Sequence, residues 1–239
     1  MNTGILYIVA TPIGNLEDIT LRAIRILGEV DMVVCEDTRT TKKLLDHYAI
    51  ETRTVSFYQN RKSGGAIKPV PKLEFLLQEL KSGKNLALVT DAGTPGISDP
   101  GNQLVREAAS REIPVIPIPG ASALTTLASV SGVDMGEFVF LGFPPHKKGR
   151  ETFFKKVLEF PMPSMFYESP HRVMKNLELL QKLELETGVF LEDKKKNIVL
   201  GRELTKMFEE IVRGDISQML EYFQKNPGKI KGEFVIIIH

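Results

Sequence analysis

Two carboxylates, two hydroxyls and three glycines lie within the eleven residues from Asp91 to Gly101, directly after the apolar run 86–90. Proline fixes φ and lacks an N–H, and glycine tolerates positive φ, so the segment cannot continue as helix or strand and forms a loop of defined shape. Open α/β sheets bind ligands beyond the carboxyl ends of their strands. We therefore expect this loop to form one wall of a small-molecule site.

Part of this polar content has a simpler explanation. Asp99 suits the N-cap of a following helix with Pro100 at its first position, which needs no ligand. Capping does not explain why Asp91, Thr94 and Ser98 share a loop already shaped by glycine and proline. These three side chains are the ones we expect to face a ligand.

The segments after two other expected strands extend the same edge. Pro119–Ala123 places small residues and free N–H groups at the start of a helix, which leaves room for a ligand. The loop 11–18 lacks the spaced glycines of a dinucleotide site, and no phosphate-binding Gly-x-x-x-x-Gly-Lys-Ser/Thr motif occurs in the chain. Taken alone, loop 11–18 is a tight turn with Asp18 or Thr20 as N-cap.

Two polar clusters in the second half leave their interpretation open. The segment 166–172 brings a carboxylate, an imidazole and a guanidinium within seven residues, either as a polar site or as a helix start capped by Ser169. The segments 202–206 and 208–214 are by default a charged hairpin at a sheet edge. The residues alone do not decide between these alternatives.

Composition excludes several classes of protein. The chain has 239 residues, 42% hydrophobic and 26% charged, and no apolar run long enough to cross a bilayer. Its start lacks the basic and apolar regions of a secretory signal, so we expect a cytoplasmic protein. One cysteine, Cys35, and four histidines without ligand spacing predict no metal site. A net charge of +1 argues neither for nor against nucleic acid.

Short apolar runs alternate with amphipathic helices in the first half, which is the pattern of a parallel sheet. The expected strands are residues 5–10, 32–35, 54–57, 86–89 and 115–118, and the expected helices are 20–27, 38–47, 72–81 and one after Pro100. Most of these runs are continuously apolar, as in strands covered on both faces.

The second half predicts a different sheet. Prolines and a glycine between residues 114 and 120 mark a boundary, so we expect domains at 1–120 and 121–239. The expected strands are 138–142, 164–167, 198–201, 207–213 and 234–238, and the expected helices are 122–131, 149–159, 170–183 and 215–223. Two strands joined without a helix indicate a mixed or antiparallel sheet.

Read in order, seven motifs resemble one family. They are residues 9–18, 35–39, 91–101, 119–122, 142–145, 167–172 and 202–210. Together they are similar to the bacterial small-subunit ribosomal RNA 2'-O-ribose methyltransferases of the tetrapyrrole (corrin/porphyrin) methylase superfamily, from Ile5 to about Ile238. The resemblance implies a two-domain α/β fold with a mainly parallel N-terminal sheet, a mixed C-terminal sheet and S-adenosylmethionine in a cleft between the domains. It also implies a homodimer that methylates the ribose of a cytidine in the decoding region of 16S rRNA, within the small ribosomal subunit.

The resemblance assigns roles to particular residues. Implied cofactor contacts are Thr11, Pro12, Gly14, Asp91, Gly93, Thr94, Ile97, Ser98, Ser122 and Ala123 from the first half, and Tyr167, Leu204, Gly232 and Glu233 from the second. A ribose hydroxyl is a poor nucleophile, so some group should take or polarise its proton. Candidate catalytic residues are Glu168, His171, Arg172 and Lys206. Glu168 or His171 would manage the proton, while Arg172, Arg202 and Lys206 would hold phosphate or ribose.

The basic stretch 146–150 is where we expect rRNA backbone contact, through Lys147, Lys148 and Arg150, together with Arg202. A solvated helix start explains the stretch equally well. After residue 57 many family members carry a histidine-rich turn, where this chain has 58–61 as Tyr-Gln-Asn-Arg. A catalytic histidine at that turn is therefore not expected.

Two rival functions follow from the same motifs. The first keeps the methyl donor but transfers the methyl group to a tetrapyrrole precursor or to a translation-factor residue. The second is a non-catalytic ribosome-assembly factor that retains the cofactor pocket as scaffold. Labelled methyl transfer and cofactor binding distinguish both from an rRNA methyltransferase.

Overall fold

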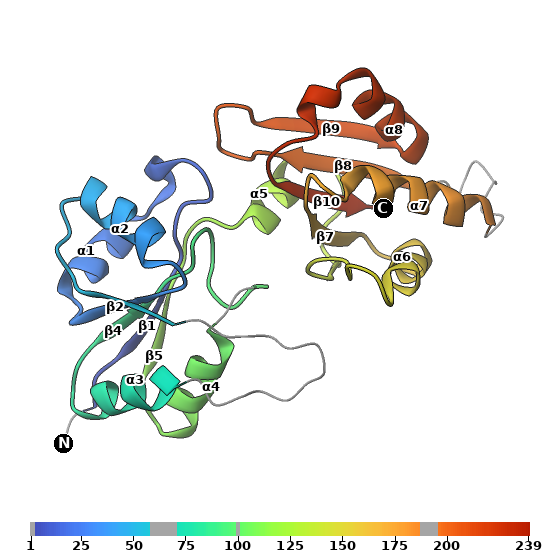
Figure 1. Cartoon of the computed structure of the whole chain (residues 1–239). Helices are drawn as coiled ribbons and strands as arrows, with labels where there is room; N and C mark the ends of the chain where they lie inside the picture. Colours follow the sequence, from blue (N-terminus) through green and yellow to red (C-terminus); the bar gives the residue numbers. More distant parts are fainter. Residues whose placement is uncertain (1–2, 58–70, 99–100, 187–195) are drawn as a thin grey trace. The chain divides into compact units, whose positions relative to one another are not determined.

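The computed structural model describes residues 3–57, 71–98, 101–186 and 196–239. The chain divides into two compact units, Met1–Ser122 and Ala123–His239, each with its own sheet (Figure 1). Asp99, Pro100 and the segment 58–61 lie outside the described residues. In the described part of the chain, no helix is both long enough and apolar enough to span a bilayer.

The first unit is built on a five-stranded sheet in the order β3-β2-β4-β1-β5, with every described pairing parallel. Its elements are β1 (Leu6–Val9), η1 (Leu16–Asp18), α1 (Leu21–Glu29), β2 (Met32–Cys35), α2 (Thr38–His47), β3 (Thr54–Ser56), α3 (Pro71–Lys81), β4 (Leu86–Leu88), α4 (Asn102–Ser110) and β5 (Val115–Ile118). The expected parallel α/β organisation is confirmed.

Helices cover both faces of this sheet, which explains the continuously apolar strands. In β2, Met32 and Val34 belong to the core with α3 and α4, whereas Val33 and Cys35 belong to the core with α1 and α2. Figure 1 shows these two pairs of helices on opposite sides of the sheet. A strand buried on both faces places an apolar residue at every position.

The second unit contains a mixed sheet in the order β6-β7-β10-β8-β9. Its elements are α5 (Ala123–Val130), β6 (Val139–Phe140), α6 (Arg150–Glu159), β7 (Ser164–Glu168), α7 (Val173–Glu186), β8 (Asn197–Arg202), β9 (Glu210–Asp215), α8 (Ile216–Lys225), η3 (Pro227–Lys229) and β10 (Phe234–Ile238). Among the described pairings of this second sheet, β6 with β7 is parallel and the others are antiparallel. The expected mixed sheet, with a charged hairpin of β8 and β9 at its edge, is confirmed.

Helices α6, α7 and α8 share one core with this sheet. Helix α5 packs against β8 at Gly201, where a Cβ atom would lie 2.9 Å from Cδ1 of Leu127. Glycine therefore leaves room for the Leu127 side chain where α5 meets this strand, and a larger residue would force that side chain to shift.

The structure corrects some expected boundaries. Strand β9 begins at Glu210 and not at residue 207, because successive turns between Glu203 and Glu209 carry the chain out of the hairpin. Helix α7 begins at Val173 and not at residue 170, and the Ser169 hydroxyl accepts from Nε of Arg172 at 3.2 Å. The N-cap of α1 is Thr20, since Asp18 belongs to η1.

Candidate functional site

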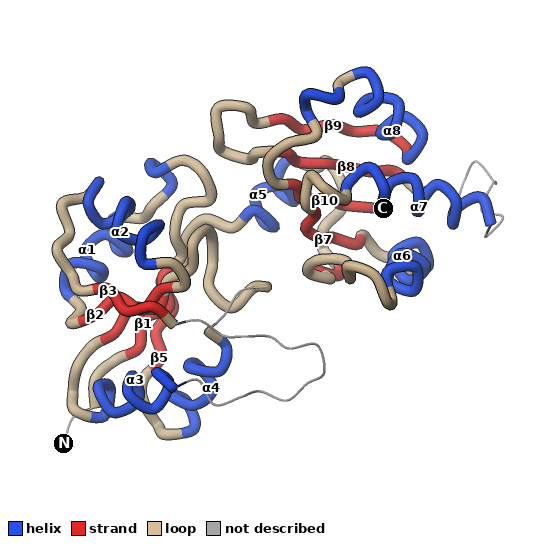
Figure 2. Tube along the Cα trace, in the orientation of Figure 1, coloured by secondary structure: helices blue, strands red, loops and turns tan. Residues whose placement is uncertain are grey.

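The loops after β1 and β4 are joined into one surface at the carboxyl edge of the first sheet. The amide of Thr11 donates to Gly93 O at 2.9 Å, and the amide of Gly93 donates to Thr11 O at 3.0 Å. The buried Thr11 hydroxyl donates to Thr90 O at 3.1 Å. This side chain therefore holds the two loops in register, and Figure 2 draws these loops in tan beyond the strands.

The loop after β4 requires glycine at its first bend. Gly93 has φ +84°, and a Cβ atom there would lie 3.4 Å from Cγ2 of Ile13 and 3.8 Å from Ala121 O. The Thr94 hydroxyl donates to the same Ala121 carbonyl at 3.1 Å, which ties the loop to the segment after β5. Ser98 is also left-handed, with φ +66°. A non-glycine residue in that region is strained, and such residues concentrate at functional sites.

Asp91 is held by a residue from the neighbouring strand end. Its Oδ1 accepts the amide of Asp37 at 3.2 Å, and no described residue donates to its Oδ2. The Asp37 carboxylate binds the guanidinium of Arg39, with Oδ2 and Nη2 2.6 Å apart. The hydrogen bond from Arg39 lowers the pKa of Asp37 to about 2, whereas burial, together with the charge of Asp37, raises the pKa of Asp91.

Sequence reasoning gave no role to Asp37 and Arg39. The available signal was their position directly after β2, next to the strand that ends at Asp91. Because β2 and β4 are hydrogen-bonded neighbours, the polar residues that follow them meet at the same edge.

In the second unit, strand register gathers the remaining candidates at one edge of the sheet. Phe234 at the start of β10 pairs with Glu168 on one side and Arg202 on the other. The candidates that lie at, directly after or directly before these strand ends are Tyr167, Glu168, His171, Arg172, Arg202, Leu204, Lys206, Gly232 and Glu233. Segments up to 66 positions apart in sequence, from 167 to 233, therefore contribute to one edge of this unit.

Glu168 is buried, and each of its carboxylate oxygens has a partner. Oε1 accepts the amide of Ser169 at 2.7 Å and lies 3.0 Å from Nη2 of Arg172, while Oε2 accepts from the amide group of Asn176. Arg172 in turn donates through Nη1 to Pro144 O at 2.9 Å. These contacts hold the Arg172 guanidinium against the Glu168 carboxylate, and the proton-transfer role expected for Glu168 stays a prediction. His171 beside them is exposed.

Lys206 lies between two carboxylates. Its Nζ is 2.9 Å from Oε1 of Glu203 and 2.9 Å from Oε2 of Glu233. Burial opposes the charged form, but the two carboxylates raise the pKa of Lys206 above its ordinary value. Gly232 has φ +86°, and a Cβ atom there would lie 2.3 Å from the Glu203 carboxyl carbon. Glycine is therefore required where this turn meets Glu203.

Arg202 is buried and supports its own hairpin. Its Nε lies 3.3 Å from Oε2 of Glu210, and its Nη2 donates to Phe208 O at 3.0 Å. Two of its three guanidinium nitrogens are thereby engaged within the protein. These contacts favour a role for Arg202 in supporting the hairpin. Its expected contact with the rRNA phosphate backbone stays a prediction.

The basic loop before α6 is open to solvent. His146, Lys147 and Lys148 are exposed, and Arg150 is half-buried at the first position of α6. Gly149, with φ +85°, makes the turn into that helix. The loop therefore presents its cations outward from a fixed helix start.

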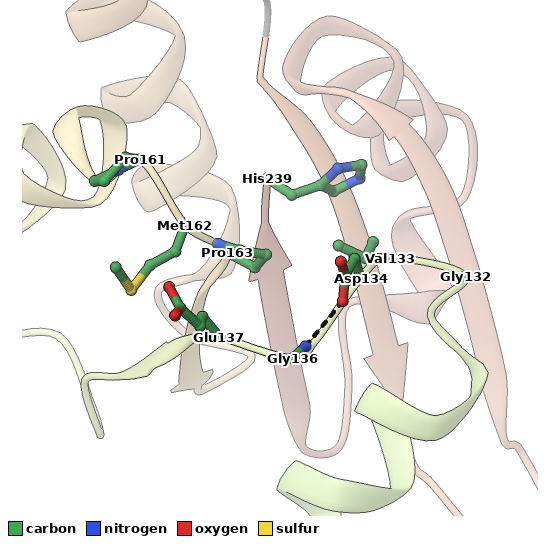
Figure 3. A pocket seen from close by; sticks show the side chains of 9 residues that line it. All are labelled: Gly132, Val133, Asp134, Gly136, Glu137, Pro161, Met162, Pro163 and His239. Atoms are coloured by element: carbon green, nitrogen blue, oxygen red, sulfur yellow. Dashed lines mark hydrogen bonds between the residues drawn. The ribbon is translucent and has the colours of Figure 1, made fainter.

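A separate hollow in the second unit lies at the opposite end of the sheet. It encloses about 620 Å³ and is lined by Gly132, Val133, Asp134, Gly136, Glu137, Pro161, Met162, Pro163 and His239 (Figure 3). Pro163 precedes β7 and His239 follows β10, whereas the candidate residues follow β7 and precede β10. No predicted site residue lines this hollow. In the described part of the chain, no three histidine, cysteine or acidic side chains are grouped to hold a metal ion.

Known proteins similar to this chain cover nearly all of it. A protein of Leptospira biflexa named "Ribosomal RNA small subunit methyltransferase I" is 44% identical over 239 residues, covering 99% of this chain and 91% of that protein. Proteins with the same name from Hydrogenobaculum sp. and Streptococcus pyogenes are 42% and 43% identical, and the matches cover 94% and 76% of those proteins. The sequence resemblance to this group is thereby confirmed.

Solved structures support the fold. Cobalt precorrin-4 methyltransferase, a cobalamin biosynthetic enzyme, has a TM-score of 0.66 at 14% identity, covering 98% of this chain and 94% of that one. Uroporphyrin III C-methyl transferase from Thermus thermophilus has a TM-score of 0.62 at 19% identity, covering 98% and 97%. The family model "Tetrapyrrole (Corrin/Porphyrin) Methylases" matches residues 5–220. With a family match over most of its length and such close full-length relatives, this chain belongs to the tetrapyrrole (corrin/porphyrin) methylase family.

Proposed function

We propose that this chain is an S-adenosylmethionine-dependent methyltransferase that methylates the ribose 2'-hydroxyl of a cytidine in the decoding region of 16S rRNA. The observation that carries the proposal is a sequence identity of 44% and 42%, along nearly the whole chain, to proteins named for methylation of small-subunit ribosomal RNA. The tetrapyrrole methyltransferases share the fold at far lower identity. We also infer that it works as a homodimer in the cytoplasm, on the small ribosomal subunit.

The carboxyl edge of the first sheet has features that suit S-adenosylmethionine. Asp91 offers a carboxylate oxygen to which no described residue donates, and ammonium groups and ribose hydroxyls both donate to carboxylates. Gly93 keeps the backbone open where a side chain would press on Ile13. Ile97, 41% exposed, supplies apolar surface beside these polar groups. We assign the cofactor contact in this unit to Thr11, Pro12, Gly14, Asp91, Gly93, Thr94, Ile97, Ser98 and Ser122.

The second unit supplies the remaining proposed contacts. Tyr167, Leu204, Gly232, Glu233 and Ala123 are the cofactor contacts that the resemblance implies there. Leu204 is buried, and Gly232 is the glycine that the Glu203 side chain requires. These assignments stay predictions, to be tested by substitution one at a time.

When bound, S-adenosylmethionine supplies a methyl group on a sulfonium, which is already activated for attack by an oxygen. The chain must then orient the ribose and deal with the proton of its hydroxyl. We assign Arg172 and Lys206 to holding the ribose and its phosphate, and Lys206 also to stabilising the negative charge that develops on the ribose oxygen, because both are cations fixed by buried or paired carboxylates. His171, which is exposed beside Arg172, is the proposed proton acceptor.

Cofactor affinity should fall at acid pH through Asp91. Burial and the charge of Asp37 raise the pKa of this carboxyl, and the ionised form accepts hydrogen bonds from the cofactor. Binding should therefore be complete above this raised pKa and decline as pH falls through it. Asp91→Asn should bind about tenfold more weakly at neutral pH and lose this pH dependence. Isothermal titration calorimetry measures both.

The matched control for this experiment is Asp46→Asn, an exposed carboxylate on α2 that pairs only with Lys42 among the described residues. It should bind like the unmodified chain at every pH. Equal affinity and equal pH dependence for Asp91→Asn would remove Asp91 from the cofactor site.

The acceptor is tested with methyl-labelled S-adenosylmethionine. Small subunits from a strain that lacks this methyltransferase should gain label on rRNA, and tetrapyrrole precursors should gain none. Label on a tetrapyrrole or a protein, with none on rRNA, would replace the proposed acceptor. Absence of cofactor binding by calorimetry would favour a non-catalytic assembly factor.

A further inference from the structure

Phe143 is an aromatic side chain held in place yet largely open to solvent. It is 54% exposed, and its ring centroid lies 5.3 Å from that of Tyr167, which packs in turn 5.0 Å from Phe140. Soluble proteins bury most large aromatic groups, since burial of their apolar area is favourable. An exposed ring with one supported side has a free face that can stack on another flat group.

The backbone around Phe143 is fixed on both sides. Gly142 O accepts the amide of Tyr167 at 2.9 Å, and Pro144 O accepts from Nη1 of Arg172 at 2.9 Å. Arg172 is itself held by the buried carboxylate of Glu168. The ring therefore stands on a rigid support at the same sheet edge as Arg172, and little freedom is lost when a partner binds.

The charge around the ring identifies the kind of partner. The ten residues from Leu141 to Arg150 contain three Lys/Arg cations and a histidine but no carboxylate. The next acidic residue, Glu151, is neutralised by Lys155 at 2.6 Å. Among the described residues no ion pair engages the cations of this segment. An exposed aromatic ring close in sequence to such cations is suited to single-stranded nucleic acid, where bases stack on rings and phosphates meet cations.

We propose that Phe143 stacks on an unpaired nucleobase of the rRNA substrate, while the cations of residues 146–150 hold the flanking phosphates. The inference rests on the proposed function, since it names how the rRNA is recognised. It gives the basic loop a partner and predicts a preference for a single-stranded segment with an unstacked base. Phe143 is thereby a binding residue, distinct from the groups that hold the ribose.

The experiment measures RNA binding without requiring methyl transfer. The probe is a short single-stranded RNA with the decoding-region sequence and one 2-aminopurine, whose fluorescence is quenched when the base stacks. Phe143→Ala should weaken binding about tenfold and reduce the quenching, whereas Phe143→Trp should retain both. Phe75→Ala, an aromatic residue 39% exposed on α3 of the first unit, is the matched control and should change neither.

A kinetic measurement separates this inference from the proposed function. With undermethylated small subunits, Phe143→Ala should raise KM about tenfold and leave cofactor affinity unchanged. If the unmodified enzyme is active and Phe143→Ala leaves RNA affinity, quenching and KM unchanged, the stacking inference is overturned and the proposed function is not. A change in sedimentation with unchanged RNA binding would assign the ring to a contact between two copies of the chain, and would also overturn it. If the unmodified chain transfers no methyl group to rRNA while the contrast in RNA binding persists, the proposed function fails and the stacking stands.

Discussion

Replacing Lys206 with methionine should lower kcat for methyl transfer by about 10²- to 10³-fold and leave the affinity for S-adenosylmethionine nearly unchanged. The two carboxylates that flank Nζ, Glu203 and Glu233, keep this side chain charged in spite of burial. A fixed cation stabilises the negative charge that develops on the attacking ribose oxygen. Removing it should therefore act on the transition state more than on binding.

The pH dependence gives a second test of this residue. A raised pKa means that the charged form persists below it and is lost only as pH rises through it. The contribution of Lys206 should therefore be constant across neutral pH and decline only in strongly alkaline solution. Single-turnover rates of the unmodified chain and of Lys206→Met, measured against pH, should differ by a constant factor across neutral pH.

The matched control is Lys225→Met, because Lys225 pairs with Glu221 on the exposed face of α8. It should retain the full rate. If Lys206→Met keeps kcat within about twofold of the unmodified chain, the lysine has no part in the chemical step.

Removal of the Glu168 carboxylate should destabilise the second unit by about 3–5 kcal/mol. Glu168→Ala would leave the mostly buried guanidinium of Arg172 without its ion-pair partner and would leave the buried Asn176 amide unpaired. It would also free the Ser169 amide at the turn into α7. Breaking one side of a buried ion pair costs more than the pair itself contributes, since an uncompensated charge remains.

Chemical denaturation and hydrogen exchange at the amides of α7 measure this effect. Glu178→Ala, an exposed carboxylate on the same helix, is the matched control and should change the free energy of unfolding by less than about 0.5 kcal/mol. Glu168→Gln keeps the shape of the side chain but places an NH₂ group against hydrogen-bond donors such as Arg172 and Asn176. This variant should therefore also be less stable than the unmodified chain. Stability of Glu168→Ala equal to that of the control would show that the carboxylate does not hold Arg172.

The sequence was sufficient to predict the architecture because its signals are local. Continuous apolar runs such as Met32–Cys35 predicted strands with both faces covered, and the runs at 115–118 and 234–238 matched strands β5 and β10. Boundaries set by longer-range contacts were harder to predict. Met207 and Phe208 have strand propensity, yet hydrogen bonds between residues 203 and 209 turn the chain there, and Met207 is 92% exposed.

The site itself was predicted as a set of segments, and its internal contacts were not. No local pattern indicates that the amide of Asp37 binds Asp91, 54 residues away, or that Glu203 contacts Gly232 and Glu233. These contacts depend on which strands become neighbours. The same limit applies to Glu168, whose residue type suggested proton transfer and whose contacts with Arg172 and Asn176 no local pattern indicated.

Mass spectrometry of 16S rRNA nucleosides tests the central claim most directly. Small subunits from a strain that lacks this methyltransferase are incubated with the purified chain and S-adenosylmethionine, with Lys206→Met run in parallel. The account predicts one new ribose-methylated cytidine in the decoding region, formed by the unmodified chain and not by the variant in the same time. An unchanged nucleoside profile with the unmodified chain, or a methyl group on a base in place of a ribose, would contradict it.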